Sequence, residues 1–138
     1  NMLKKEIKIL FPELSYQLTG ILFGVHNELG RFRNEKQYGD ALAEELQKEG
    51  IKFKREKELL ASFAGEEKGR SKTDFIIEDK IILEIKAKRR IERSDYFQLK
   101  RYLVSAEKEL GVLVNFQQKH LTPKRVLNSA IRSIRIHS

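Results

Sequence analysis

The sequence contains no cysteine and no tryptophan, and only two prolines among its 138 residues. Without cysteine the chain can form neither a disulfide framework nor a thiolate metal site, which excludes zinc fingers and favours a reducing compartment such as the cytoplasm. No apolar run approaches the roughly 20 residues of a membrane-spanning helix, and the N-terminus lacks the apolar stretch of a secretion signal. We therefore expect a soluble, cytoplasmic protein.

The length of the chain and its hydrophobic fraction of 40% suffice for one core but not for two. No internal repeat, low-complexity stretch or linker divides the sequence. We therefore expect a single domain over residues 1–138.

Positive charge is unevenly distributed along the chain. The formal net charge is +8 and the pI is near 9.7. Residues 86–101 hold seven basic and two acidic side chains, and residues 119–138 hold five basic and no acidic ones, so each segment carries +5. Such clusters favour binding to phosphate backbones through counterion release. The alternative is a solvated face on a lysine-rich protein.

Hydrophobic spacing predicts the secondary structure. Helical spacing covers residues 13–29 and the segment from Asn34, a good N-cap, to Gly50. Strand spacing covers residues 51–63, 72–77 and 81–87, with a hairpin loop at 65–69. A further helix is expected over residues 95–110, capped by Ser94 and ended by Gly111. Strands at 112–116 and 125–128 complete the chain.

This order of elements predicts the topology. A strand, a crossover helix and a second strand place the strand at 112–116 parallel to its partner. The resulting fold class is α/β, or α+β in some schemes, with a mixed central β-sheet flanked by helices.

The chemistry of the chain is concentrated between Thr73 and Lys86, which read T-D-F-I-I-E-D-K-I-I-L-E-I-K. Glu84 and Lys86 are two residues apart on a strand and therefore share a face. If residues 78–80 form a turn, Asp74 lies on the paired strand. Two carboxylates beside an ammonium could hold a divalent cation next to a water nucleophile. The alternative is an exposed ion pair that contributes little to stability.

Several short motifs occur in a fixed order along the chain. They are L-T-G-I (18–21), V-H (25–26), L-G (29–30), E-x-x-Y (35–38), A-L (41–42), T-D-F-I-I (73–77), L-E-I-K-A (83–87), Q-L-x-x-Y-L (98–103), G-V-L-V-N-F (111–116) and K-R-V (124–126). In this order they resemble the PD-(D/E)xK nuclease superfamily and, within it, the small RecB-like family named for its GxxExxY motif. The resemblance implies a restriction-endonuclease-like core and magnesium-dependent cleavage of nucleic acid.

The resemblance also implies roles for individual residues. Asp74 and Glu84 would bind Mg²⁺ or Mn²⁺, with the backbone carbonyl of Ile85 between Glu84 and Lys86 as a natural further ligand. Lys86 would be the catalytic lysine, and Glu35 would complete the site directly or through water.

Two more residues gain a role from the same resemblance. Gln98, with Tyr102, matches a Gln-x-x-x-Tyr pattern in which the glutamine helps to position the site or the substrate. His26 would join the metal site, as a helical histidine does in some RecB-like relatives; otherwise it is a hydrogen-bonded core residue.

The chain departs from the family pattern at three positions. Phe32 stands where the first glycine of GxxExxY is expected, Thr73 replaces the proline of the superfamily name, and Gly24 occupies a position where relatives often carry a glutamate. The first departure changes the loop that leads to Glu35.

The expected function is hydrolysis of phosphodiester bonds in DNA by a metal-dependent nuclease. Lys86 beside two carboxylates would orient the water nucleophile or stabilise the anionic transition state rather than act as a base. Two alternatives are a catalytically inactive nucleic-acid-binding module of the same fold and a structural subunit that binds an acidic protein. Cleavage of RNA and formation of a homodimer stay open. The residues expected to grip the nucleic-acid backbone are Lys88, Arg89, Arg90, Arg93, Lys100 and Arg101.

Overall fold

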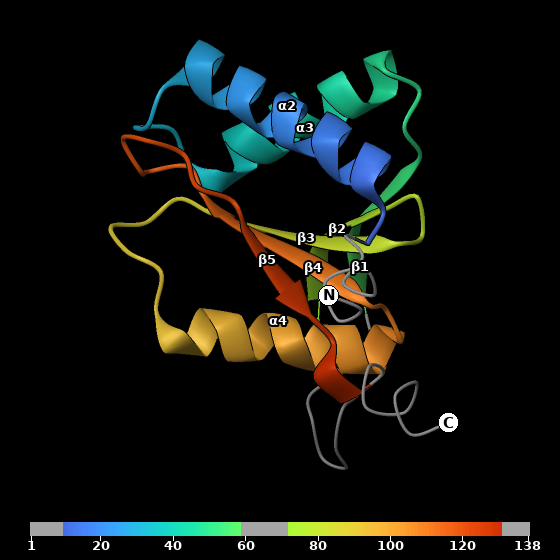
Figure 1. Cartoon of the computed structure of the whole chain (residues 1–138). Helices are drawn as coiled ribbons and strands as arrows, with labels where there is room; N and C mark the ends of the chain where they lie inside the picture. Colours follow the sequence, from blue (N-terminus) through green and yellow to red (C-terminus); the bar gives the residue numbers. More distant parts are fainter. Residues whose placement is uncertain (1–9, 59–71, 131–138) are drawn as a thin grey trace, which may run out of the picture.

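A computed structural model describes residues 10–58 and 72–130 of the chain. Five strands form one sheet in the order β1-β2-β3-β4-β5, and Figure 1 shows α2 and α3 on one face of it and α4 on the other. The elements are α2 (Pro12–Leu29), α3 (Glu35–Lys48), β1 (Phe53–Glu58), β2 (Lys72–Ile77), β3 (Ile81–Lys86), α4 (Arg93–Ala106), β4 (Leu110–Asn115) and β5 (Lys124–Leu127).

The topology follows the prediction. Strands β3 and β4 are parallel, whereas β1–β2, β2–β3 and β4–β5 are antiparallel. The sheet is therefore mixed, and α4 is the crossover that joins its parallel pair. The predicted hairpin loop at 65–69, and the part of the first predicted strand beyond residue 58, lie outside the described residues.

Alternation along β3 divides the core into two clusters. Ile81, Leu83 and Ile85 pack with α2 and α3 in the larger cluster, whereas Ile82 packs with Leu99 and other side chains of α4 in the smaller one. Because side chains two residues apart point to the same face of a strand, Glu84 and Lys86 share the face of Ile82. They therefore lie on the side of the sheet that α4 covers.

Helix α2 ends at the predicted residue, and helix α3 begins at the predicted one. Gly30 caps α2 with a φ of 77°, and the Asn34 side chain accepts a hydrogen bond of 2.8 Å from the Gln37 amide in a reciprocal capping box at the start of α3. Within the part of the chain that the structure describes, no helix is long and apolar enough to cross a membrane.

The predicted boundaries of α4 were wrong at both ends. Its N-cap is Glu92 rather than Ser94, because the Asp95 side chain accepts a hydrogen bond from the Glu92 amide and closes a capping box. At the other end Glu107 adopts a left-handed φ of 54° and ends the helix, so Gly111 falls inside β4. Gly111 is needed there for packing, since a Cβ atom would lie 2.9 Å from the buried side chain of Leu99.

Candidate active site

The predicted pair of carboxylates lies at the open end of the β2–β3 hairpin. The predicted turn at residues 78–80 forms, and the strand register runs from Ile77–Ile81 to Phe75–Leu83. Beyond that point side chains replace backbone acceptors: the Asp74 amide donates to Glu84 Oε1 at 3.0 Å, and the Ile85 amide donates to Asp74 Oδ2 at 2.8 Å. Both carboxylates are therefore fixed by backbone amides of the opposite strand.

Burial and mutual repulsion disfavour ionisation of this pair. Burial, and then the charge of Asp74, raise the pKa of Glu84 to about 9. Burial also raises the pKa of Asp74, although the hydrogen bond from the Ile85 amide opposes this effect. Glu84 is only 3% exposed. Two crowded, desolvated carboxylates form a donor set that a divalent cation would neutralise.

The backbone supplies one more oxygen at the same place. The N–H and C=O groups of one residue point to the same side of a strand, and the Ile85 N–H points toward Asp74. The Ile85 carbonyl is therefore directed to the β2 side as well. Among residues 10–58 and 72–130, no group of three His, Asp or Glu side chains could hold a metal ion by itself. The oxygen donors that fit a hard cation here are Asp74, Glu84 and this carbonyl.

Lys86 stands beside the carboxylates and contacts α4. Its ammonium lies 3.4 Å from Gln98 Oε1 and 4.0 Å from Asp95 Oδ1. The structure thus brings Gln98 next to Lys86. Tyr102, the other member of that motif, is buried in the smaller core cluster.

Asp95 is a site residue that sequence reasoning missed. It is 7% exposed, and its carboxylate accepts a hydrogen bond from the Glu92 amide and pairs with Lys88 Nζ at 2.7 Å. Burial disfavours its charge, but these partners outweigh burial and lower the pKa of Asp95. The only sequence signal was its position one helical turn before Gln98. Asp95 keeps a negative charge between Lys86 and Lys88.

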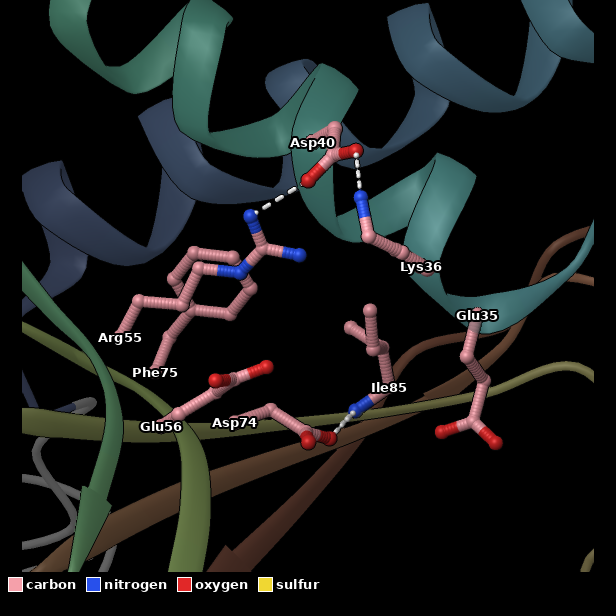
Figure 2. A pocket seen from close by; sticks show the side chains of 8 residues that line it. All are labelled: Glu35, Lys36, Asp40, Arg55, Glu56, Asp74, Phe75 and Ile85. Carbon is pink, nitrogen blue, oxygen red and sulfur yellow. Dashed lines mark hydrogen bonds and ion pairs between the residues drawn. The ribbon is translucent and has the colours of Figure 1, made fainter.

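Glu35 approaches the pair from the opposite face of the sheet. It is the first residue of α3, and Figure 2 shows its side chain descending toward the sheet beside Ile85. Partial burial, followed by the charge of Asp74, raises the pKa of Glu35. Glu35 and Asp74 line the same pocket of about 540 Å³. Glu84 and Lys86 do not line it. The lining residues are Glu35, Lys36, Asp40, Arg55, Glu56, Asp74, Phe75 and Ile85.

Strand β1 adds an acid that no motif indicated. Glu56 falls opposite Asp74 in the β1–β2 register, lines the same pocket, and contributes to the raised pKa of Asp74. Its φ is 55°, a left-handed value that costs a non-glycine residue about 1 kcal/mol or more. Above it, Arg55 and Asp40 form an ion pair of 2.7 Å (Figure 2).

His26 binds the loop after β4. Its Nε2 donates to the carbonyl oxygen of Gln118 at 2.8 Å, and its ring lies 6.3 Å from that of Phe116. Phe116 also contacts Tyr38, the tyrosine of E-x-x-Y. The two rings are stacked with their centres 4.3 Å apart. These contacts match the interpretation of His26 as a hydrogen-bonded, partly buried residue.

The predicted backbone-binding residues differ in their surroundings. Lys88 is half-buried and pairs with Asp95, and Lys100 lies over the ring of Phe97 at 6.0 Å. The exposed members of the set are Arg89, Arg90, Arg93, Lys100 and Arg101. All of them follow Lys86 directly in the loop to α4 or lie on α4.

Comparison with known proteins identifies the family of the chain. The family profile described as the PD-(D/E)XK nuclease superfamily matches residues 12–126. No curated protein and no solved structure matches the chain. The matched segment includes Glu35, Asp74, Glu84, Lys86 and Gln98, as well as strands β1 to β4 and most of β5. The chain belongs to the PD-(D/E)XK nuclease superfamily.

Proposed function

We propose that this protein is a divalent-metal-dependent nuclease that hydrolyses phosphodiester bonds in DNA. The observation that carries the proposal is the placement of Asp74 and Glu84. Each carboxylate is bonded to the other's strand, and the charge of Lys86 is close enough to oppose the rise in pKa that burial causes in both. The proposal treats residues 1–138 as one domain. It also assigns the chain to the GxxExxY family, on the match of Glu35 and Tyr38 to E-x-x-Y. The Tyr38 hydroxyl donates to the Gly30 carbonyl and so fixes the loop that precedes Glu35.

The proposed metal ligands are Asp74, Glu84 and the Ile85 carbonyl, with Glu35 acting directly or through water. Mg²⁺ or Mn²⁺ suits such an oxygen donor set, and it supplies charge neutralisation at the phosphate and a more acidic water. The protein residues hold the two carboxylates in place through the Asp74 and Ile85 amides.

Lys86 has the task of orienting the water nucleophile and stabilising negative charge on the phosphate in the transition state. Gln98 accepts a hydrogen bond from its ammonium, and Asp95 lies on the same side. These two groups of α4 limit the positions that the long lysine side chain can take. A fixed positive charge in a partly buried site stabilises a negatively charged transition state more strongly than the same charge does in water.

The exposed arginines and Lys100 are proposed to bind the sugar–phosphate backbone. Contacts of this kind position the substrate without reading its sequence. Their charges follow Lys86 along the loop to α4, so a phosphate chain that reaches the site passes them. Binding should therefore weaken steeply as the salt concentration rises.

The test is cleavage of plasmid DNA and of a panel of linear and branched DNAs in Mg²⁺ or Mn²⁺. Glu84→Ala and Lys86→Ala should each reduce the cleavage rate by about a hundredfold or more and keep most of the DNA affinity. The matched control is Lys80→Ala, an exposed lysine in the turn at the other end of the hairpin, which should cut normally.

Two results would count against the proposal. Undiminished cutting by Glu84→Ala or Lys86→Ala would show that the site lies elsewhere. Tight binding by the wild-type protein without cutting in either metal would instead identify a nucleic-acid-binding module that has lost catalysis.

A further inference from the structure

The loop between α2 and α3 presents a phenylalanine to solvent between two arginines. Phe32 is 82% exposed, and the guanidinium carbon of Arg31 lies 5.2 Å from the centre of its ring. A large apolar side chain with this exposure contributes little to the stability of the fold, because it buries little surface. It stands where the GxxExxY motif has glycine, so the family pattern does not explain it.

The loop is held firmly by the residues that surround it. The Tyr38 hydroxyl donates to the Gly30 carbonyl and accepts from the Arg33 amide at 3.3 Å. Arg31 Nε donates to the Gln117 carbonyl at 2.9 Å. The ring of Phe32 is therefore carried on a backbone that is fixed at both ends, and binding through it would cost little conformational entropy.

A chain of contacts places this loop at the same end of the sheet as the candidate active site. Gln117, which binds Arg31, donates its own amide to the Asn115 side chain at 3.2 Å, and that side chain also accepts from the Lys88 amide at 3.1 Å. Figure 1 shows the loops that follow α2, β3 and β4 at this one end. Three residues after Phe32, Glu35 enters the pocket of Asp74.

We propose that Phe32, flanked by Arg31 and Arg33, is a stacking site for an unpaired nucleobase next to the bond to be cut. An exposed aromatic ring can stack on any base that is free on one side, and guanidinium groups beside it attract the adjoining phosphates. Bases inside a duplex are stacked on both sides and offer no such surface. The preferred substrate is thus a nucleic acid with a single-stranded segment, a flap or a frayed end at the cleavage point.

This inference rests on the proposed nuclease function, and binding can test it apart from cleavage. The probes are a labelled single-stranded 20-mer and a blunt duplex of the same sequence, measured by fluorescence anisotropy in EDTA with the full chain. Phe32→Ala should weaken binding of the single strand about tenfold and leave duplex binding nearly unchanged. Phe32→Trp should restore the single-strand affinity.

The matched control is Tyr16→Ala, because Tyr16 on α2 is 83% exposed and so equals Phe32 in accessibility. This variant should bind both probes like the wild type. A 2-aminopurine base in the single strand adds a direct readout, since its fluorescence falls when it stacks. We expect quenching with the wild type and with Phe32→Trp, and none with Phe32→Ala.

The outcomes separate the two proposals. If Phe32→Ala leaves single-strand affinity and quenching intact, or weakens both probes equally, the stacking site is refuted. A dimer in sedimentation velocity that Phe32→Ala dissociates would assign the ring to contact between copies of the chain and would also refute it. If the stacking results hold but Lys86→Ala cuts normally, the proposed active site fails and the stacking site stands.

Discussion

At the turn end of the β2–β3 hairpin, Ile77 and Ile81 face each other with no exposed surface, and the backbone ladder is intact. At the open end the same two strands carry Asp74 and Glu84, and their carboxylates take the place of ladder acceptors. At the first end, the folded protein by itself satisfies the backbone hydrogen-bonding groups and buries the apolar side chains. At the second end, burial raises the pKa of both carboxyl groups and so disfavours their ionisation.

This difference assigns stability and chemistry to opposite ends of one hairpin. Removing a side chain at the turn end takes away burial, which is the main source of folding free energy. Neutralising a carboxylate at the open end removes repulsion and desolvation, which oppose folding. Functional sites commonly hold such unfavourable groups. Substitutions at the two ends should therefore change stability with opposite sign.

The largest effect is expected at the turn end. Ile81→Ala should lower the free energy of unfolding by about 3 kcal/mol, because it leaves a cavity at a fully buried position. Urea denaturation followed by circular dichroism measures this loss. The rise in Tm on addition of Mn²⁺ should stay as in the wild type. A variant that loses this metal response would show that the two ends are not separable.

Glu84→Gln should raise the stability of the metal-free protein at neutral pH. Below pH 4.5, its ordinary pKa, Glu84 is protonated in the folded and the unfolded chain alike. Between 4.5 and about 9 the folded protein keeps a proton that the unfolded chain releases, so rising pH lowers stability. Glutamine removes this penalty, and we expect a gain of about 2 kcal/mol at pH 7.5, roughly 5 °C in Tm.

Two further measurements test the Glu84→Gln prediction. At pH 4 most of the gain in Tm should be lost, because Glu84 of the wild type is then largely protonated in the unfolded chain as well as in the folded one. Added Mn²⁺ should stabilise the wild type but not Glu84→Gln. A glutamine variant that is less stable than the wild type at pH 7.5 in EDTA would contradict the opposition between the ends.

A smaller effect is expected from Asp95→Asn, which acts beside the open end. The asparagine oxygen can still accept from the Glu92 amide, so α4 keeps its cap, but the charge that holds Lys88 and faces Lys86 is lost. We expect kcat for cleavage to fall about tenfold with little change in KM or Tm. Loss of Tm without loss of kcat would make Asp95 a structural residue only.

The smallest effect is expected from the ion pair at the turn end. Asp79 contacts Lys108 at 2.8 Å, but its side chain is 79% exposed, so solvent screens the pair. Asp79→Asn should therefore leave Tm and cleavage at wild-type values. It is the matched control for Asp95→Asn, since each variant removes one charge from an aspartate–lysine pair. Thermal denaturation and the plasmid assay compare the two variants directly.

The sequence predicted the parts of this molecule that depend on short-range rules. The period of two along β3 placed Glu84 and Lys86 on one face, and the turn at residues 78–80 placed Asp74 across from them. The crossover rule predicted that β3 and β4 are parallel. Motif order supplied Gln98, which the structure places 3.4 Å from Lys86.

Other features were missed, one because two local caps compete and two because they depend on contacts between distant segments. Ser94 looks like an N-cap, but the Asp95 side chain reaches back to the Glu92 amide and starts the helix earlier. The position of Glu56 opposite Asp74 follows from a strand register that composition cannot supply. The loop after β4 holds His26 through the Gln118 carbonyl, a partner 92 residues away in the chain.

Gly111 has a consequence for the geometry of the candidate site. With hydrogen in place of a methyl group, β4 lets Leu99 of α4 approach closely, and Leu99 is the next residue after Gln98. The separation of these two layers sets how far Gln98 and Asp95 stand from the lysine on β3. An alanine at position 111 would thicken the interface, push the helix outward and stretch those contacts, although Gly111 contributes no side chain to the candidate site.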